Sequence, residues 1–325
     1  MAFQVNGAFR FHAGDRADQR TEYQRDRDRI LYCSAFRRLA EVTQVVSAAE
    51  GHSFHNRLTH SLKVAQIARR LAEKLVSEQP AEAKELGGPE PEVAEAAALA
   101  HDLGHPPFGH IAEEELNKLA REAEEQDGFE GNAQSFRIIT KLAVRTSAYV
   151  GLNLTSATLN AVLKYPWYRA ERGEYRRKWG VYPAEEAEFA WARATSSLPS
   201  EIRSVEAELM DWADDIAYSV FDVDDFFRAG LVPLHQLFSD RLERERFVEN
   251  ATARLQKWKK EPEPITTAFR ELMESFPPRS LQGDFRGTVE QRAFLRRVDV
   301  ETGRTLREWY STQGPLLACG PMCRH

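Results

Sequence analysis

Cysteine is scarce in this sequence, with three residues among 325, at positions 33, 319 and 323. An odd number without regular spacing excludes a disulfide framework and favours a reducing compartment. No stretch approaches the roughly 20 consecutive apolar residues of a membrane-spanning helix, so no membrane partner is expected. The N-terminal stretch MAFQVNGAFRFHAGD lacks a basic start followed by an apolar run, and we therefore expect a cytoplasmic protein.

Charge of one sign is not in large excess either. Lys and Arg total 44 and Asp and Glu total 50, which gives a net charge of −6 and does not mark an obligate nucleic-acid binder. A hydrophobic content of 42% with 29% charged residues excludes a disordered chain. Histidine is unevenly distributed, because six of the nine lie close together: His52, His55, His60, His101, His105 and His110.

Apolar residues recur at helical spacing through most of the chain, and strict strand-like alternation is scarce. We therefore predict an all-α fold. Helices are expected over residues 56–75, 91–103, 111–125, 132–144, 155–163, 201–228, 237–258 and 265–276, with a loop over 165–183. The helix that Pro91 opens is almost wholly apolar, which predicts that it is buried.

A His-Asp pair, His101 and Asp102, stands on this apolar helix. An unpaired buried charge costs several kcal/mol, and a bound cation would remove that cost. His60 and one of the adjacent residues Asp214 and Asp215, from two other helices, could converge with the pair on one ion. Two imidazoles and two carboxylates suit Mn, Fe, Ni, Zn or, less naturally, Mg. The alternative is an exposed His-Asp pair at the end of the helix.

Three residues of the helix predicted over 201–228 recur every four positions: Asp214, Tyr218 and Asp222. This spacing predicts one stripe along the helix, at the edge of a cleft. The alternative is a solvated acidic face that also includes Asp224 and Asp225. That alternative explains the later aspartates better than it explains Asp214.

Several strings occur in a fixed order within residues 25 to 230: FRRLAEVTQV, HNRLTHSLKV, HDLGHPPFGH, GFEGNAQSFR, LNLT and ADDIAYSVFD. Together they resemble the motifs of the HD-domain phosphohydrolases and, within these, of the bacterial deoxyguanosinetriphosphate triphosphohydrolases. The resemblance implies an all-α HD-domain helical bundle with additional peripheral helices. It also implies hydrolysis of a deoxynucleoside triphosphate, with dGTP favoured, to the deoxynucleoside and inorganic triphosphate.

The same resemblance divides the chain into three regions. Residues 1–50 form an N-terminal arm and helix that contribute to the substrate pocket, and residues 51–230 form the HD phosphohydrolase core. Residues 231–325 form a C-terminal helical extension. Family members run on for further helices, whereas this chain ends in GPLLACGPMCRH, so we expect the extension to be truncated.

Carried over by position, the metal ligands that the resemblance implies are His60, His101, Asp102 and Asp214. In ADDIAYSVFD the family's ligand stands four residues before the Tyr, which selects Asp214 over Asp215. The expected cofactor is one divalent metal ion per site, with Mn or Mg favoured and Fe, Ni, Co or Zn as alternatives.

In HDLGHPPFGHIAEE the family implies that His105, His110 and Glu113 serve catalysis or hold the phosphates. His110 and Glu113 are three residues apart and hence neighbours on a helix. An imidazole with an unperturbed pKa of about 6.5 can exchange a proton near neutrality. We hypothesise that His110 transfers a proton with support from Glu113, and that His105 contacts phosphate.

Four further residues are expected to bind the substrate. Arg57, one turn before His60, is positioned to contact the triphosphate, because a planar guanidinium binds phosphate oxygens well. Gln44 and Asp222 resemble the family residues that hold the sugar 3′-hydroxyl. Tyr218 resembles the ring that packs against the deoxyribose where a 2′-hydroxyl would clash.

Two other functions are open at this point. One is an HD-type phosphohydrolase with the same site that acts on another nucleotide phosphoester. The other is a nucleic-acid-binding module with a regulatory nucleotide site, suggested by the basic and aromatic stretch Tyr165 to Gly180, in which Arg172, Arg176 and Arg177 would contact single-stranded DNA. An ordinary exposed loop is the alternative there. The family implies a homo-oligomer, and a nucleotide activator is a further partner left open.

Overall fold

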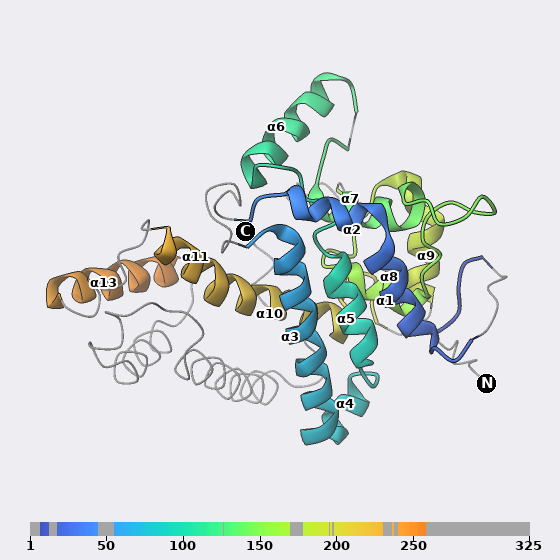
Figure 1. Cartoon of the computed structure of the whole chain (residues 1–325), viewed down its shortest axis with the longest axis horizontal. Coiled ribbons are helices and arrows are strands. Elements are labelled where there is room, and N and C mark those ends of the chain that lie inside the picture. Colours follow the sequence, from blue (N-terminus) through green and yellow to red (C-terminus); the bar gives the residue numbers. More distant parts are fainter. Residues whose placement is uncertain are drawn as a thin grey trace. The chain divides into compact units, whose positions relative to one another are not determined.

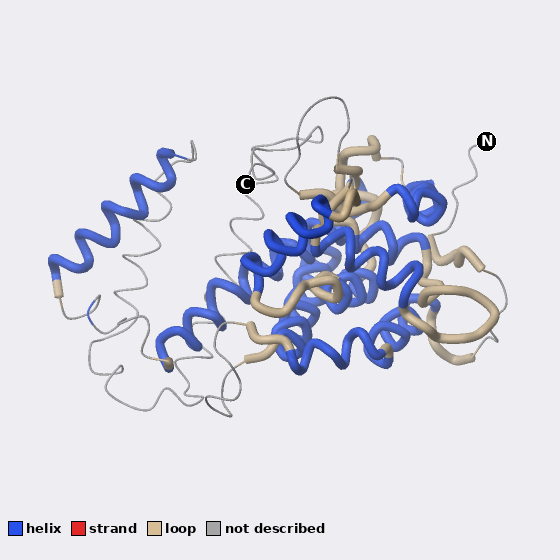
Figure 2. The backbone as a smooth tube through the Cα atoms, turned by 90° about the horizontal axis from the view of Figure 1, so that it is seen from above, coloured by secondary structure: helices blue, strands red, loops and turns tan. Residues whose placement is uncertain are grey.

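The computed structural model describes residues 7–12, 18–44, 55–125, 127–169, 178–194, 196, 198–229, 236 and 240–257. In these ranges the regular elements are helices, and extended pairing is limited to isolated bridges such as that between Arg10 and Thr155 (Figure 1, Figure 2). The prediction of an all-α fold is confirmed. The α-helices are α1 (Glu22–Tyr32), α2 (Ser34–Arg38), α3 (Arg57–Glu78), α4 (Pro80–Glu85), α5 (Pro91–Ala100), α6 (Gly109–Glu122), α7 (Gly131–Arg137), α8 (Ser156–Val162), α9 (Glu186–Ala194), α10 (Val205–Ala217), α11 (Val223–Arg228) and α13 (Arg241–Lys257).

The described residues belong to two compact units, one up to Asp225 and the other from Phe226 onward. The helix predicted over 237–258 corresponds to α13 in the second unit. The helix predicted over 265–276 and the C-terminal tail lie outside the described residues. The region boundaries expected near residues 50 and 230 stay predictions. Among the described helices, none combines the length and the apolar content needed to cross a membrane.

Helix α5 lies at the centre of the first unit and contacts α1, α3, α8 and α10. Figure 1 shows α3 and α5 side by side. Alanine is frequent along α5, and such small side chains let neighbouring helices approach closely. The prediction that this helix is buried is confirmed by seven of its residues: Val93, Ala94, Ala96, Ala97, Ala98, Leu99 and Ala100.

The prediction of one uninterrupted helix over residues 201–228 is wrong, because a π-helical turn interrupts it. Helix α10 begins after Ser204, whose hydroxyl accepts from the Ala207 N–H, and it gives way to a π-helical turn, η5 (Tyr218–Asp222). Hydrogen bonds from residue i to i+5 in such a turn shift the direction of the side chains that follow. Tyr218 is 61% exposed and Asp222 is 2% exposed, so the two residues differ in burial, and the stripe along the edge of a cleft stays a prediction.

The helix predicted over 132–144 has the same kind of interruption. Helix α7 ends at Arg137 and continues as a π-helical turn, η3 (Ile138–Leu142). The first turn of α7 packs against the turn that follows α5. There, the Gly104 N–H donates to Ser135 Oγ at 2.9 Å, and Ser135 Oγ donates to the His101 carbonyl at 2.8 Å. Ser135 therefore fixes the backbone on both sides of Asp102.

Gly104 leaves no room for a side chain at this contact. A Cβ atom there would collide with the Gly131 carbonyl oxygen and the Ser135 nitrogen. We expect Gly104→Ala to lower the free energy of unfolding by about 1–3 kcal/mol, as overpacking does in other cores. Urea unfolding followed by circular dichroism measures this. Gly131→Ala, with its Cβ 3.3 Å from a movable Glu113 oxygen, is the milder comparison. An unchanged midpoint for Gly104→Ala would contradict the prediction.

Candidate metal centre and active site

The first turn of α3 supplies two site residues. Asn56 caps this helix: its side chain accepts from the Thr59 N–H, and Thr59 Oγ1 accepts from the Asn56 N–H. This reciprocal pair fixes where the helix starts. It therefore sets Arg57 and His60 within the same first turn, with His60 buried.

The His-Asp pair lies directly after α5 and not within it, because the helix ends at Ala100 and His101 caps its C-terminus. His101 Nδ1 lies 2.6 Å from the Ala98 carbonyl oxygen, which places the ring proton on Nδ1. The other ring nitrogen, Nε2, is 3.5 Å from Asp102 Oδ2 and 3.7 Å from Asp214 Oδ1. It is buried and makes no hydrogen bond within the described part of the chain. This nitrogen therefore faces two carboxylates, and in its deprotonated form it would offer a lone pair to a cation bound between them.

Asp214 of α10 completes the cluster. Its Oδ1 is 3.0 Å from His60 Nε2, and the rings of His60 and His101 have their centroids 5.8 Å apart. The structure thus brings together the four residues that the sequence predicts as ligands. Ligand atoms of His60, His101 and Asp102 all lie within 4.8 Å of one another. Two nitrogen and two oxygen donors suit a divalent transition metal.

The electrostatics of the cluster favour positive charge. Burial alone would lower the pKa of His101, but Asp102 and Asp214 raise it to about 9. Burial alone would raise the pKa of Asp102, but His101 and Arg57 hold it below its usual value, and His101 and His60 do the same for Asp214. Both carboxylates are therefore ionised at neutral pH. In this structure the proton on His101 offsets part of their charge, and a metal ion that displaced this proton would meet two carboxylates and the Nε2 atom.

Arg57 lies beside this cluster, where its Nη1 donates to Asp102 Oδ2 at 2.7 Å. Its guanidinium is largely shielded from solvent, with 12% of the side chain exposed. The sequence predicts that Arg57 contacts a triphosphate. The structure places its guanidinium against the carboxylate of Asp102, a predicted metal ligand. A phosphate bound next to the metal site would therefore lie close to this guanidinium.

The three residues predicted for catalysis come together on one side of the His-Asp pair. His105 Nδ1 is 3.9 Å from Asp102 Oδ1, and the ring of His105 meets that of His110 edge to face at 5.7 Å. Burial, with a further contribution from Arg57, lowers the pKa of His105 to about 4. His105 is therefore a neutral imidazole at neutral pH, which can bind a phosphate oxygen as a hydrogen-bond donor and not as a cation.

His110 and Glu113 form the contact that their spacing predicts. Helix α6 begins at Gly109, and His110 Nδ1 lies 2.9 Å from Glu113 Oε2. The turn before it is strained, because Phe108 adopts φ 68° beside Gly109 at φ 66°. The His110 side chain is 78% exposed, whereas Glu113 is buried. The carboxylate can thus orient an imidazole that reaches outward.

Two residues that the sequence analysis did not single out support Glu113. Lys178 Nζ lies 2.9 Å from Glu113 Oε2 and 3.2 Å from Glu130 Oε1, and the Gly131 N–H donates to Glu113 Oε1 at 2.9 Å. Burial alone would raise the pKa of Glu113, but the bonds from His110, Lys178 and Gly131 lower it to about 2. Glu113 is therefore a carboxylate across the working range of pH.

Lys164 plays the corresponding part for Asp214. Its Nζ lies 2.5 Å from Asp211 Oδ1 and 3.6 Å from Asp214 Oδ2. Burial alone would lower the pKa of Lys164, but Asp211 and Asp214 raise it. A lysine between the apolar run NAVL and the aromatic run YPWY is the signal that could have identified it. Its partners are distant in sequence, so the sequence could not supply them.

Gln44 and Asp222 meet although they are far apart in the chain, with Gln44 Nε2 donating to Asp222 Oδ2 at 3.2 Å. The remaining side-chain oxygens, Gln44 Oε1 and Asp222 Oδ1, are buried and unsatisfied within the described residues. Burial raises the pKa of Asp222. A hydroxyl group placed here could donate its one proton to either of these oxygens, and the predicted contact with the sugar 3′-hydroxyl stays a prediction. Tyr218 is exposed, and its predicted contact with deoxyribose stays a prediction.

The described residues of the stretch from Tyr165 to Gly180 form no helix, as expected of a loop, but two of its tryptophans are buried. Trp167 and Trp179 are buried in a cluster with Ala133 and Tyr182, so these two rings are not available to stack bases. The three arginines at positions 172, 176 and 177 lie outside the described residues. The remaining candidates for contact with single-stranded DNA are therefore residues that the structure does not describe.

Comparison with known proteins places this site within a family. The HD domain family model matches residues 57–219, which contain all four predicted metal ligands. Similar proteins occur in Streptomyces coelicolor, with 45% identity over 250 residues (74% of this chain, 55% of that protein), and in Corynebacterium efficiens, with 43% over 233 residues (70% and 50%). A third, from Bifidobacterium longum, is 41% identical over 224 residues (66% and 44%).

All three relatives carry the name deoxyguanosinetriphosphate triphosphohydrolase-like protein. The chain spans about half the length of the curated relatives it matches. The family match covers half of the chain, and its ends enclose the cluster of His60, His101, Asp102 and Asp214. This chain belongs to the HD domain family.

Proposed function

We propose that this protein hydrolyses a deoxynucleoside triphosphate, with dGTP favoured, to the deoxynucleoside and inorganic triphosphate. The observation that carries the proposal is the convergence of His60, His101, Asp102 and Asp214, in which the buried Nε2 of His101 faces two carboxylates and makes no hydrogen bond within the described residues. The names of the relatives support the substrate class. The matched acceptors Gln44 and Asp222 support a sugar with a free hydroxyl.

The reaction needs a water molecule to attack the α-phosphorus while the bond from that phosphorus to the 5′ oxygen breaks. A divalent ion held by the four ligands, Mn or Mg in our proposal, would supply charge screening and Lewis acidity toward the phosphate oxygens. Arg57 would bind further phosphate oxygens, and neutral His105 would donate to one. His110 would deliver a proton to the departing 5′ oxygen, with Glu113 orienting its ring.

Product analysis of the full chain with each of the four deoxynucleoside triphosphates and Mn²⁺ tests this function. Inorganic triphosphate with a deoxynucleoside is the expected result, and Asp102→Ala should release none. Phosphate or pyrophosphate would instead support a hydrolase with the same site that acts on another phosphoester. If no product of either kind formed, the proposed activity would be wrong. The nucleotide activator, single-stranded DNA, the homo-oligomer and the alternative metals stay predictions.

Two substrates that differ only in the 3′-hydroxyl test the predicted contact with the sugar. The normal enzyme should use a deoxynucleoside triphosphate at least about a hundredfold more efficiently than its 2′,3′-dideoxy analogue, because buried acceptors built for a hydroxyl are left unpaired without it. Gln44→Ala and Asp222→Asn should reduce this preference mainly by slowing the normal substrate. The ratio of the two kcat/KM values measures it. An equal preference in the normal enzyme and both variants would refute the assignment.

A further inference from the structure

One of the six clustered histidines, His55, has no part in the proposed reaction. Four others belong to the candidate metal centre and active site, and His52 lies outside the described residues. His55 directly precedes Asn56, the residue that caps α3. Its side chain is 19% exposed and contacts the fully buried carboxylate of Asp225 in α11. A buried carboxylate is costly unless donors surround it, so this contact ties Asp225 firmly to the start of α3.

Asp225 accepts one hydrogen bond from the main chain of His55 and one from its ring. The His55 backbone N–H donates to Asp225 Oδ2 at 2.9 Å, and His55 Nδ1 lies 2.8 Å from the same oxygen, so Nδ1 carries a proton that the carboxylate accepts. The other ring nitrogen, Nε2, contacts Nζ of Lys63, an ammonium group that can only donate. The ring of His55 thus joins a cation to an anion.

The same group of side chains includes Phe221 of the π-helical turn η5. Lys63 Nζ lies 3.7 Å from the centroid of the Phe221 ring, and the ring of His55 meets that ring at 5.9 Å. A cation over an aromatic face is attracted by the negative face of the ring. Phe221 directly precedes Asp222, and Asp225 follows Asp222 by three residues. The chain is therefore held on both sides of Asp222.

Two side-chain contacts link the same two parts of the chain. One is the bond of 3.2 Å from Gln44 to Asp222, and the other is the contact of His55 with Asp225. An antiparallel bridge joins the residue before Gln44 to the residue after His55, so these two residues belong to paired segments. The bond from Gln44 connects side chains alone. The contact of His55 includes a backbone donor, and it therefore fixes the spacing of the segments themselves.

We propose that His55 is a positioning residue for the predicted sugar contact, because through Asp225 it holds Asp222 in place. This role rests on the proposed function, in which Gln44 and Asp222 contact the sugar 3′-hydroxyl. Hydrogen bonds depend steeply on distance and angle, so a small shift of the Asp222 carboxylate would weaken that contact. The preference for a 3′-hydroxyl should therefore depend on the hydrogen bond that the His55 ring donates.

Binding of dGTP and of its 2′,3′-dideoxy analogue tests this role. Isothermal titration of the full chain with EDTA measures both dissociation constants without turnover. The normal chain should bind dGTP about tenfold more tightly, since a hydrogen bond to a charged acceptor contributes on that order. His55→Ala and His55→Phe cannot donate and should reduce this preference to within about twofold. His55→Asn, whose side-chain amide can donate to Asp225, should keep it.

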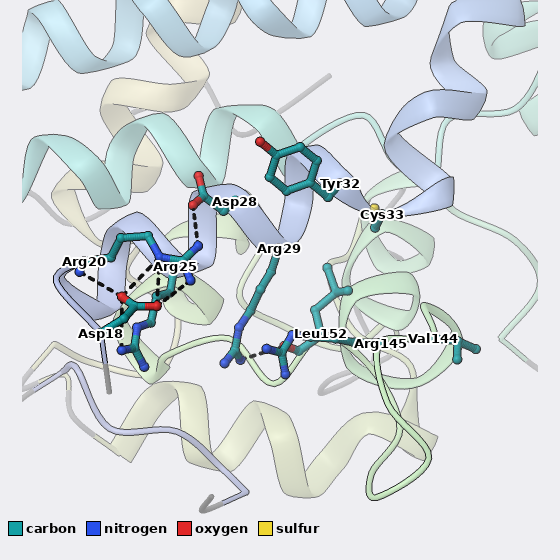
Figure 3. Close-up of a pocket in the computed structure, with 10 residues that line it drawn as sticks. All are labelled: Asp18, Arg20, Arg25, Asp28, Arg29, Tyr32, Cys33, Val144, Arg145 and Leu152. Carbon is teal, nitrogen blue, oxygen red and sulfur yellow. Dashed lines mark hydrogen bonds and ion pairs between the residues drawn. The ribbon is translucent and has the colours of Figure 1, made fainter. Parts of the chain in front are cut away.

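Arg145→Gln is the control, because it also changes a donor, the Arg145 Nη1 group that lies 2.5 Å from Tyr149 Oη. Arg145 lines the cavity of about 490 Å³ shown in Figure 3, and no residue that lines this cavity belongs to the candidate active site. This variant should keep the normal preference. Thermal unfolding of every variant checks the fold, and His55→Phe fills the space of the ring if the alanine variant unfolds.

The outcomes separate this role from the proposed function. If His55→Phe kept the normal preference, or if His55→Asn lost it equally, His55 would stabilise the fold alone and the proposal would be overturned. A normal chain without any preference would overturn it as well, because there would be no sugar contact to position. If the preference depended on His55 as expected but no inorganic triphosphate were released, the proposed function would fail while the positioning role stood.

Discussion

Replacing Asp214 by alanine is expected to lower turnover by about a thousandfold or more, whereas the same change at Asp215 should leave it within about twofold. Asp214 Oδ1 lies 3.0 Å from His60 Nε2, and this carboxylate is one of the two that make the cluster favourable for a cation. Asp215 is exposed on the neighbouring position of α10. Two adjacent aspartates of one helix thus provide a variant and a control with the same chemical change at neighbouring positions.

Metal binding should distinguish the Asp214 variant from the Asp215 variant in the same way. We expect Asp214→Ala to lose tightly bound Mn²⁺ in equilibrium dialysis, while Asp215→Ala retains one ion per chain. Because Lys164 also contacts Asp214, thermal unfolding of each variant must confirm that the fold is kept. Asp214→Asn, which keeps the shape of the side chain and removes its charge, is the second test if alanine unfolds the protein. A stronger effect at Asp215 than at Asp214 would show that the ligand is misassigned.

Replacing His110 by alanine should lower kcat by about a hundredfold to ten-thousandfold while Mn²⁺ stays bound, since proton transfer by a positioned group contributes about that much. Initial rates under saturating substrate, with metal content measured on the same samples, give both quantities. His110 is largely exposed and contacts Glu113, so its loss leaves the core intact. Turnover equal to that of the normal enzyme, with metal bound, would remove His110 from the mechanism.

Glu113→Gln is the companion variant. The amide still reaches His110 but carries no charge, so kcat should fall less than in His110→Ala, by roughly tenfold to a hundredfold. The lowered pKa of Glu113, about 2, means that the normal enzyme carries this charge at every pH at which activity is measured. An effect larger than that of His110→Ala would point to a separate role, through Lys178 or the Gly131 N–H.

Local features of the sequence predicted the helices well where they depend on neighbouring residues. The apolar spacing in α3, the alanine-rich run of α5 and the spacing of His110 and Glu113 each describe contacts within a few positions of one another. The sequence analysis missed the π-helical turn at Tyr218–Asp222, because its hydrogen bonds depend on how α10 packs and not on a periodic pattern of residue types.

By itself, the sequence determined the all-α fold, the His-Asp pair and the residue types that could join it on one ion. Only the tertiary structure decided that His60, His101, Asp102 and Asp214 share a space, and that Lys164 and Lys178 support the carboxylates at its edge. It also brought Gln44 against Asp222, although the two residues are 178 positions apart in the chain. The physical reason is the same in each case: charges far apart in the chain acquire their partners only when packed helices bring them within a few ångströms.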